Sequence, residues 1–480
     1  MSDIRILISC SPGEVRIAEL SDGELTGLTL HRDGQETLVG DIYLGRVEAV
    51  IHNLQAAFVD IGLERSGYLA LAEVRPRDAT DDAIGDYLNE GDAVVVQVTR
   101  DPEAGKGAKL TARPVLSGRD LVFTPGQPGI SISRRIADAE ERDRLAAVME
   151  GQDDAAGGFI LRTAAEAAED DDLLAEAERL RAEWSVIDDR RGAAKAPAVL
   201  RRDLEPACRI LREQGGVDLG AVVVDDAEVC ARVKAFAAEQ MPDIADLIRA
   251  HKDEAGVFEA EGVEEMIDQA TAAKVRLPSG ANIIIDETSS LTAIDVNSAG
   301  AAGGGNRERG AFEVNDEAAR EIAHQIQLRN LSGLLVIDFI TMRDKRYQEQ
   351  VLETLRQALA NDPCHPFVGG FTRFGLVELT RRRQGASLTE IIFGGPAAAV
   401  PTPLSTALEA LRAVVREASA SAAPGLVLAA HSAVIETLEG AAAAARETAA
   451  RKLGGGLELV ADDRLARDSF EVRPATGDTP

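Results

Sequence analysis

The segment from residue 275 to residue 342 constrains the fold most, because acidic residues interrupt apolar strand patterns there. Apolar residues dominate IIIDETSSLTAIDVN (283–297), helix-forming residues follow in EVNDEAAREIAHQIQLRN (313–330), and GLLVIDFI (333–340) is apolar again. A strand, a helix and a second strand in this order predict neighbouring strands of a sheet covered by helices. We predict 283–297 as a single strand.

Two aspartates on these strands are the strongest chemical signal. Asp295 and Asn297 stand two residues apart, so their side chains share one face of a strand, and Asp338 interrupts the second apolar run. Aspartate is seldom buried unless it is paired or binds a metal, so we expect two buried acids that converge. Magnesium takes one or two carboxylates and leaves positions for water and phosphate. The alternative is a turn residue at Asp295 and a hydrogen-bonded core acid at Asp338.

The rest of the chain predicts an α/β protein of several domains. Short, evenly spaced strands rich in glycine run through 4–35 and 37–118, and the second stretch is typical of a small barrel. Helices are predicted at 131–149 and 164–191, around a strand at 157–163. After 396–403 the chain is rich in alanine, and helices at 404–419 and 432–453 predict a small separate α/β unit.

Composition limits the function. The chain has 480 residues, enough for three or four domains, and its formal charge is −29. Bulk positive charge therefore cannot bind nucleic acid, and a phosphate partner needs local basic patches or a metal ion. No apolar run is long enough to span a membrane. The four cysteines are scattered without a CxxC pair, which favours the reducing cytoplasm over a disulfide framework or a cysteine zinc site.

Several motifs closely resemble the catalytic region of the ribonuclease E/G family, bacterial endoribonucleases that cut single-stranded RNA. They are VRLPSGANIIIDETSSLTAIDVNSA (275–299), NDEAAREIAHQIQLRN (315–330), SGLLVIDFITM (332–342) and TRFGLVELTRRR (372–383), and the resemblance runs from about residue 5 to 395. It implies that Asp295 and Asp338 hold Mg²⁺, or Mn²⁺, and that Asn297 assists catalysis by orienting Asp295 or touching the scissile phosphate. The family often has a second acid where this chain has Thr341, which we do not count as a ligand.

The resemblance also implies an arrangement of domains. It assigns an RNase H-like subdomain to residues 1–36 plus 208–274. It assigns an inserted S1 domain, which is an OB-type β-barrel, to residues 37–118. It assigns a 5′-monophosphate sensor subdomain to residues 119–207. It assigns a DNase I-like catalytic subdomain to 275–395 and, more weakly, a small C-terminal α/β domain to 404–476. In length the chain is similar to the ribonuclease G branch.

Three RNA-binding positions in the S1 domain follow from the same resemblance. Phe58 and Tyr68 match aromatics on which bases stack, and Lys106 supplies a positive charge for the RNA backbone. Taken alone, both rings are more typical of a barrel core.

The sensor and the remaining RNA contacts are basic or hydroxyl residues. Arg162 and Thr163 match the family's pocket for a 5′-monophosphate: Thr163 would cap a helix and Arg162 would hold the phosphate by a bidentate fork. Without the resemblance they would be a helix cap beside a solvated arginine. Arg134, Arg135 and Arg373 are further candidate RNA contacts, and each fits an ordinary surface residue equally well.

The chain departs from the family after the catalytic region. The family's cysteine pair, which shares zinc between two chains, is replaced by SLTEIIFGGPAAAVPTP (387–403), so we expect no zinc link. A homodimer through 404–476, a homodimer through another surface and the absence of a dimer stay open. We expect no long scaffold of the kind that recruits a degradation assembly in larger members. The glycine-rich loop 298–310 follows the expected metal site in the sequence. Its backbone would approach the substrate, or the loop is only a flexible connector.

These features together predict a magnesium-dependent endoribonuclease. By resemblance it would hydrolyse A/U-rich single-stranded RNA to 5′-phosphate and 3′-hydroxyl ends, respond to a 5′-monophosphate, and serve ribosomal RNA processing and messenger RNA decay in the cytoplasm. The alternatives are a catalytically silent S1-containing RNA-binding protein and a nuclease for structured RNA or DNA.

Overall fold

The computed structural model describes residues 4–76, 82–102, 105–153, 156–214, 219–253, 255–298, 307–396, 398–420, 425–454 and 456–475. Residues 299–306 of the predicted loop 298–310 lie outside these ranges. The chain forms two compact units, one from 1–34, 220–230 and 248–480, the other from 35–219 and 231–247. Among the described residues, helices fall short of the length and apolarity that crossing a membrane requires.

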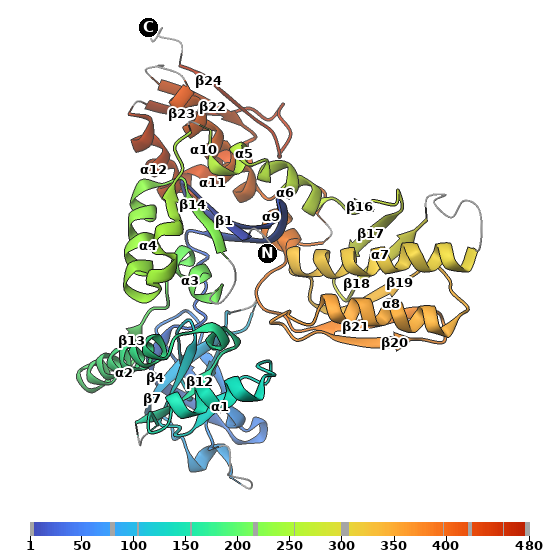
Figure 1. Ribbon diagram of the computed structural model, residues 1–480. Helices are drawn as coiled ribbons and strands as arrows, with labels where there is room; N and C mark the ends of the chain where they lie inside the picture. The colour runs from blue at the N-terminus through green and yellow to red at the C-terminus, as the bar shows by residue number, and fades with distance from the viewer. Residues whose placement is uncertain are drawn as a thin grey trace. The chain divides into compact units, whose positions relative to one another are not determined.

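A closed five-stranded barrel forms the first part of the second unit, as predicted. Its strands pair in the order β4 (Ile42–Ile51), β5 (Ala56–Asp60), β6 (Gly67–Ala70), β8 (Lys109–Thr111) and β7 (Ala93–Arg100), and β7 pairs back with β4. Figure 1 labels β4 and β7 of this barrel. Short 3₁₀ helices lie at His52–Leu54, Leu71–Glu73 and Ile84–Asp86, and β13 (Ala198–Arg201) adds to β4. Tyr43, Val59 and Leu69 fill the interior. The closed ring is consistent with an S1 or OB-type domain.

A four-stranded sheet follows in the same unit. It pairs β11 (Ile130–Ile132), β12 (Gly157–Leu161), β10 (Leu121–Pro125) and β9 (Leu116–Ser117), and α1 (Ala139–Val148) and α2 (Asp170–Ala193) pack on Phe123 and Phe159. Both helices begin later than predicted. The carboxylate of Asp138 caps α1 by accepting a hydrogen bond from the Glu140 amide at 3.0 Å, and a 3₁₀ turn, Thr163–Ala167, precedes α2.

The first unit begins with an N-terminal sheet built from segments far apart in sequence. Its order is β15 (Ile248–Ala250), β14 (Leu219–Val224), β1 (Ile4–Ser11), β2 (Glu14–Ser21) and β3 (Glu24–Arg32). α5 (Val257–Ala260) and α6 (Val263–Thr271) bury Phe258 and Val263 against Leu7 and Leu20. The connecting elements are α3 (Pro206–Glu213), α4 (Ala227–Gln240) and a 3₁₀ helix at Pro242–Leu247.

A six-stranded sheet, which we call the acid-pair sheet, carries the residues of the strongest motif. Its order is β16 (Lys274–Arg276), β17 (Asn282–Glu287), β18 (Thr292–Asn297), β19 (Gly333–Asp338), β21 (Leu376–Arg381) and β20 (Phe367–Phe371). The strand predicted at 283–297 is wrong: it is a hairpin, because Thr288 and Leu291 close a turn through a 3.0 Å backbone hydrogen bond. Between β18 and β19 runs α7 (Arg307–Leu328), and the two strands are parallel.

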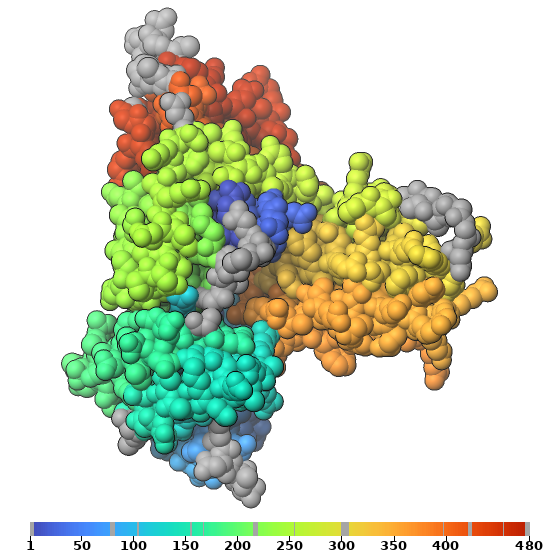
Figure 2. All heavy atoms as spheres, viewed as in Figure 1, coloured from blue at the N-terminus to red at the C-terminus, as the bar shows by residue number. Residues whose placement is uncertain are grey.

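The two faces of the acid-pair sheet differ in burial. Ile283, Ile294 and Ile337 point to α7 and to α8 (Lys345–Ala358), which pack side by side over one face (Figure 1). The outer surfaces of these helices form the yellow and orange surface in Figure 2. Alternate residues on the other face, such as Ala293 and Glu378, are exposed. We call this the open face, and it holds every polar side chain of the candidate site.

The C-terminal residues fold around a three-stranded sheet of their own. β22 (Gly425–Ala430) lies between β23 (Gly456–Ala461) and β24 (Phe470–Pro474), with α10 (Pro403–Ala420), α11 (Ser432–Glu439) and α12 (Ala443–Leu453) around it. The helix predicted at 432–453 is broken, because the chain turns at Gly440. α9 (Leu388–Phe393) precedes the unit.

The C-terminal unit is docked on the N-terminal sheet rather than detached. The buried carboxylate of Glu14 accepts hydrogen bonds from Arg32 at 2.8 Å and from Arg412 of α10 at 2.6 Å. Arg32 also donates to the Ser405 hydroxyl at 3.1 Å. At the β1–β2 turn, a β-carbon on Gly13 would come within 2.5 Å of Ala445, so glycine permits the close approach of α12.

Candidate functional site

The acid-pair sheet brings Asp295 and Asp338 directly side by side. They are register partners on β18 and β19, two parallel neighbours that lie roughly 4.8 Å apart. Register partners on parallel neighbours point to the same face, and here that is the open face. The intervening helix α7 therefore produces the convergence that the sequence predicts.

The expectation that both acids are buried is wrong. Asp295 and Asp338 are exposed, because the alternation that sends Ile294 and Ile337 into the core sends their neighbours outward. The alternative of a buried core acid at Asp338 fails for the same reason. Exposure leaves both carboxylates accessible to a hydrated cation and to a substrate.

Asn297 fixes one of the two carboxylates. Its side-chain amide donates a hydrogen bond of 2.7 Å to Asp295 Oδ2. Within the described ranges, neither Asp295 nor Asp338 has an arginine or lysine at ion-pair distance. Two like charges therefore face each other without a protein cation between them.

This donor set fits magnesium better than a softer metal. Among described residues, groups of three or more His, Cys, Asp or Glu that could enclose a metal do not occur. Magnesium is commonly held by only one or two carboxylates and keeps several waters, whereas structural zinc takes four protein ligands. The pair is thus suited to an ion that shares its coordination with a phosphate.

The open face around the acid pair carries basic and aromatic residues. On the edge strand β16, Lys274 and Arg276 are exposed on either side of Val275, which packs against the core. At the other side, the β20–β21 turn presents Arg373 and Phe374, both exposed. The turn adjoins Leu376, the register partner of Asp338.

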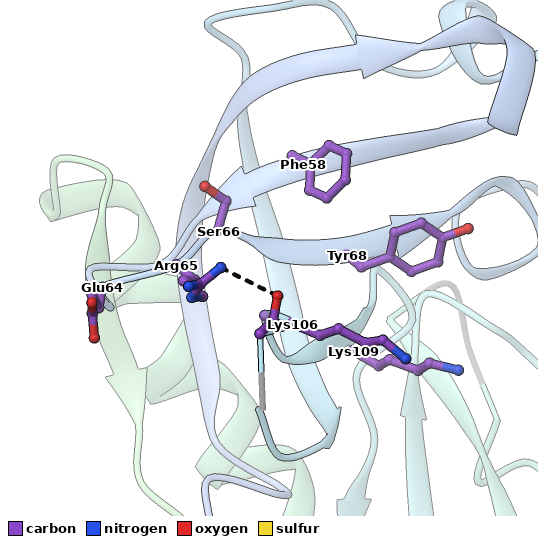
Figure 3. A pocket seen from close by; sticks show the side chains of 9 residues that line it. Phe58, Glu64, Arg65, Ser66, Tyr68, Lys106 and Lys109 are labelled. Carbon is purple, nitrogen blue, oxygen red and sulfur yellow. Dashed lines mark hydrogen bonds between the residues drawn. The ribbon is translucent and has the colours of Figure 1, made fainter. Parts of the chain in front are cut away.

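The barrel of the second unit holds a cavity of about 640 Å³ lined by the predicted aromatics and lysine (Figure 3). Phe58 of β5, Tyr68 of β6 and Lys109 of β8 occupy one row across three strands, and Lys106 lies beside them. The two rings meet edge to face, with centroids 6.1 Å apart. Both are half-buried, so they belong to the cavity wall and not to the barrel core.

Arg162 is more deeply engaged than a free phosphate ligand would be. Its Nη1 donates to the carbonyl oxygens of Gly118 at 2.8 Å and Arg119 at 3.0 Å. Burial, with a smaller contribution from Arg212, lowers the pKa of this guanidinium. A phosphate would have to meet the other nitrogens of the side chain or displace these carbonyls.

The predicted cap at Thr163 is wrong. Arg162 occupies the N-cap position of the 3₁₀ turn, and the Thr163 hydroxyl instead lies 3.1 Å from the Ser133 hydroxyl. This contact places Thr163 next to the segment that carries Arg134 and Arg135, both exposed. The structure therefore gathers four of the predicted contacts at one end of the four-stranded sheet.

Buried acids underlie this basic cluster. Glu176 of α2 accepts backbone hydrogen bonds from Arg119, Asp120 and Leu121, which fixes the loop whose carbonyls Arg162 contacts. Burial first, and then the negative charge of Glu176, raise the pKa of Asp120 to about 6. The loop beneath Arg162 is thus held by a hydrogen-bonded carboxylate.

Known proteins match the chain over most of its length. The model of the ribonuclease E/G family matches residues 115–384. Ribonuclease G of Haemophilus influenzae is 38% identical over 404 residues, which are 82% of this chain and 82% of that protein. Ribonuclease G of Escherichia coli K12 is 33% identical over 91% of this chain and 92% of its own. The chain belongs to the ribonuclease E/G family.

Membership of the ribonuclease E/G family makes the chain an endoribonuclease. It confirms the resemblance that the motifs predict. Ribonuclease E of Nostoc sp. is also similar, at 38% identity over 74% of this chain, but that match covers only 52% of the larger protein. The length shared with the ribonuclease G proteins agrees with the predicted branch.

Sequence reasoning noted Lys109 only as a positive charge that follows Lys106, and it missed Phe374. Lys109 extends the aromatic row of the cavity, a position that only strand register reveals. Phe374 stands in TRFGLVELTRRR beside the predicted Arg373, and its pattern alone does not distinguish an exposed ring from a core ring. Arg113, the other positive charge that follows Lys106 in the sequence, instead donates a hydrogen bond of 2.7 Å to the Ala72 carbonyl.

Proposed function

We propose that this ribonuclease E/G family member hydrolyses single-stranded RNA with Mg²⁺, or Mn²⁺, held between Asp295 and Asp338. The observation that carries the proposal is the register pairing of two exposed carboxylates with no protein cation at ion-pair distance in the described part of the chain. When bound, the ion would polarise a phosphoryl oxygen and lower the pKa of an attacking water.

The chain's own residues would prepare this chemistry by orientation. Asn297 holds the Asp295 carboxylate in one rotamer through its 2.7 Å hydrogen bond, so less side-chain freedom is lost when a ligand arrives. Asp338 supplies the second oxygen donor from the neighbouring strand. We infer in-line attack by water, leaving a 5′-phosphate on one product and a 3′-hydroxyl on the other.

The barrel cavity supports single-stranded RNA as the substrate. Its half-buried rings offer faces to unpaired bases, and Lys106 and Lys109 offer charge to the backbone. We also propose that cleavage favours A/U-rich sites. The enzyme would act in ribosomal RNA processing and messenger RNA decay in the bacterial cytoplasm. The relatives named Ribonuclease G and Ribonuclease E support the class of activity.

The decisive experiment compares labelled single-stranded RNA, double-stranded RNA and DNA with magnesium or with EDTA. We expect cleavage of single-stranded RNA only with magnesium, and none by Asp338→Asn, which keeps the size of the side chain and retains RNA binding. Binding without cleavage by the unmodified chain would identify a silent RNA-binding protein. Cleavage by Asp338→Asn would remove Asp338 from the metal site.

We also propose that a 5′-monophosphate on the RNA stimulates cleavage through Arg162 and Thr163. The proposal is supported by their position beside Ser133, Arg134 and Arg135. Arg162→Ala should remove the advantage of 5′-monophosphorylated over 5′-hydroxyl RNA in cleavage rate, with little effect on the latter. An unchanged ratio of the two rates, in a variant that melts like the unmodified chain, would reject the sensor.

A further inference from the structure

Phe374 is the most exposed large apolar side chain of the described residues. Its exposed fraction is 89%, against 71% for Phe367 and 62% for Leu54. Single exposed apolar residues are ordinary on protein surfaces, so exposure alone carries no function. The position of this ring and the ordered backbone of the turn that carries it make it different.

The turn that presents Phe374 is tightly fixed. The Thr372 amide donates to the Leu376 carbonyl at 2.8 Å, and the Thr372 hydroxyl accepts hydrogen bonds from the amides of Phe374 at 3.3 Å and Leu376 at 3.2 Å. Gly375 adopts a φ of +86°, a conformation that glycine takes without strain. The backbone is therefore ordered before any ligand arrives.

This turn lies at the edge of the sheet where the acid pair lies. Asp338 is the last residue of β19, and its register partner Leu376 is the first residue of β21. Phe374 precedes Leu376 by two residues, so its backbone lies roughly 8 Å from that of Asp338, from strand spacing and rise. The exposed guanidinium of Arg373 precedes the ring.

We propose that Phe374 is a stacking platform for an RNA base one or two nucleotides from the phosphate held at the acid pair, with Arg373 contacting the adjoining backbone. The inference rests on the proposed function and deepens it by naming a positioning residue. Every base has a π-face, so such a platform would hold the strand in place without selecting its sequence. Because the turn is already ordered, binding would cost little conformational entropy.

A second copy of the chain is the other occupant that an exposed ring could meet. Charge favours RNA, because Arg373 beside the ring and Lys274 and Arg276 on the far edge strand flank the acid pair with exposed positive residues. An RNA strand crossing the open face would meet a base platform, then the acid pair, then basic residues.

The test measures kcat and KM with Mg²⁺ on a short single-stranded RNA that has one cleavage site. Phe374→Ala should lower kcat/KM by about 5- to 150-fold, which corresponds to ~1–3 kcal/mol of base stacking. Phe374→Trp should retain activity. Phe367→Ala is the matched control, an exposed ring on β20 at the opposite end of the same sheet, and should behave as the unmodified chain.

RNAs with a single abasic nucleotide at successive positions near the cleavage site separate stacking from a structural role. An abasic nucleotide at one of these positions should lower the activity of the unmodified chain. The same abasic RNA should not lower the activity of Phe374→Ala any further than the substitution itself does. Three results would reject the stacking role of Phe374. They are an unchanged kcat/KM for Phe374→Ala, an equal loss of activity by Phe374→Ala on all RNAs, and a change from dimer to monomer in sedimentation. Failure of the unmodified chain to cleave any RNA would instead reject the proposed function.

Discussion

Asp295 and Asp338 meet because each occupies the exposed side of a strand whose alternate residues are buried in the core. The repulsion between two adjacent carboxylates is tolerable in water, where charges interact weakly, and it becomes useful once a divalent ion joins them. Asn297 adds order to this pair by fixing Asp295. At the residue scale, the site therefore depends on one hydrogen bond and on one register.

Asn297→Ala should raise the magnesium concentration needed for half-maximal cleavage by about 10- to 100-fold, as is usual when a residue that orients a metal ligand is lost. The physical reason is that Asp295 then rotates freely and must be ordered by the ion itself. A magnesium titration of cleavage rate measures the shift. Thr380→Ala, at an exposed position on the same sheet, is the control, and an unshifted curve for Asn297→Ala would contradict the orienting role.

At the scale of elements, the barrel arranges rings and charges by strand pairing. Phe58, Tyr68 and Lys109 come together only because β5, β6 and β8 are neighbours in register. The aromatic row can hold bases while the lysines hold the backbone, and the two contributions depend differently on salt. This difference provides a direct way to separate them.

Phe58→Ala should weaken binding of a single-stranded RNA by ~1–3 kcal/mol without altering the slope of log affinity against log salt. Lys109→Ala should weaken binding less at high salt and reduce that slope by about 0.7, because one phosphate contact is lost. Fluorescence anisotropy over a range of salt concentrations measures both. A changed slope for Phe58→Ala would place its effect on the fold of the barrel instead.

The elements also show how far the sequence predicts this structure. The barrel, and the order of strand, helix and strand around the acids, follow from hydrophobic periodicity. The turn at 288–291 does not, because Thr-Ser-Ser lacks glycine and proline and is closed by Thr288 itself. The alternation of apolar and polar residues along a strand does not show which face of the sheet is covered by helices. The exposure of Asp338 therefore could not be predicted from the sequence. The carbonyls that Arg162 contacts lie 43 and 44 residues away in sequence.

At the scale of the first unit, a buried ion network joins its first and last segments. Glu14 pairs with Arg32 of the N-terminal sheet and with Arg412 of the C-terminal unit, and Arg32 reaches the Ile391 carbonyl at 2.8 Å. Buried ion pairs contribute little net stability, but removing one partner leaves uncompensated charge. One buried carboxylate therefore contacts both the N-terminal sheet and the docked C-terminal unit.

Glu14→Ala should lower the free energy of unfolding of the first unit by ~3–5 kcal/mol, because it removes the carboxylate partner of the buried Arg32 guanidinium and of the partly buried Arg412 guanidinium. Cleavage by a protease in the connection at 396–403 should become faster. Glu24→Ala, at an exposed position on β3, should change stability by less than about 0.5 kcal/mol. Thermal unfolding and limited proteolysis measure the two effects, and equal behaviour of the two variants would argue against the network.

At the scale of the whole molecule, the proposed function requires that one divalent ion binds between Asp295 and Asp338. Anomalous diffraction from crystals of the full chain soaked in Mn²⁺ tests it directly, with Asp338→Asn crystals treated in parallel. We expect a peak within coordination distance of both carboxylates that disappears in Asp338→Asn. Two results would contradict binding of the ion between Asp295 and Asp338 in a chain that cleaves RNA with Mn²⁺. One is an anomalous peak found only elsewhere, and the other is a pair of carboxylates that point apart.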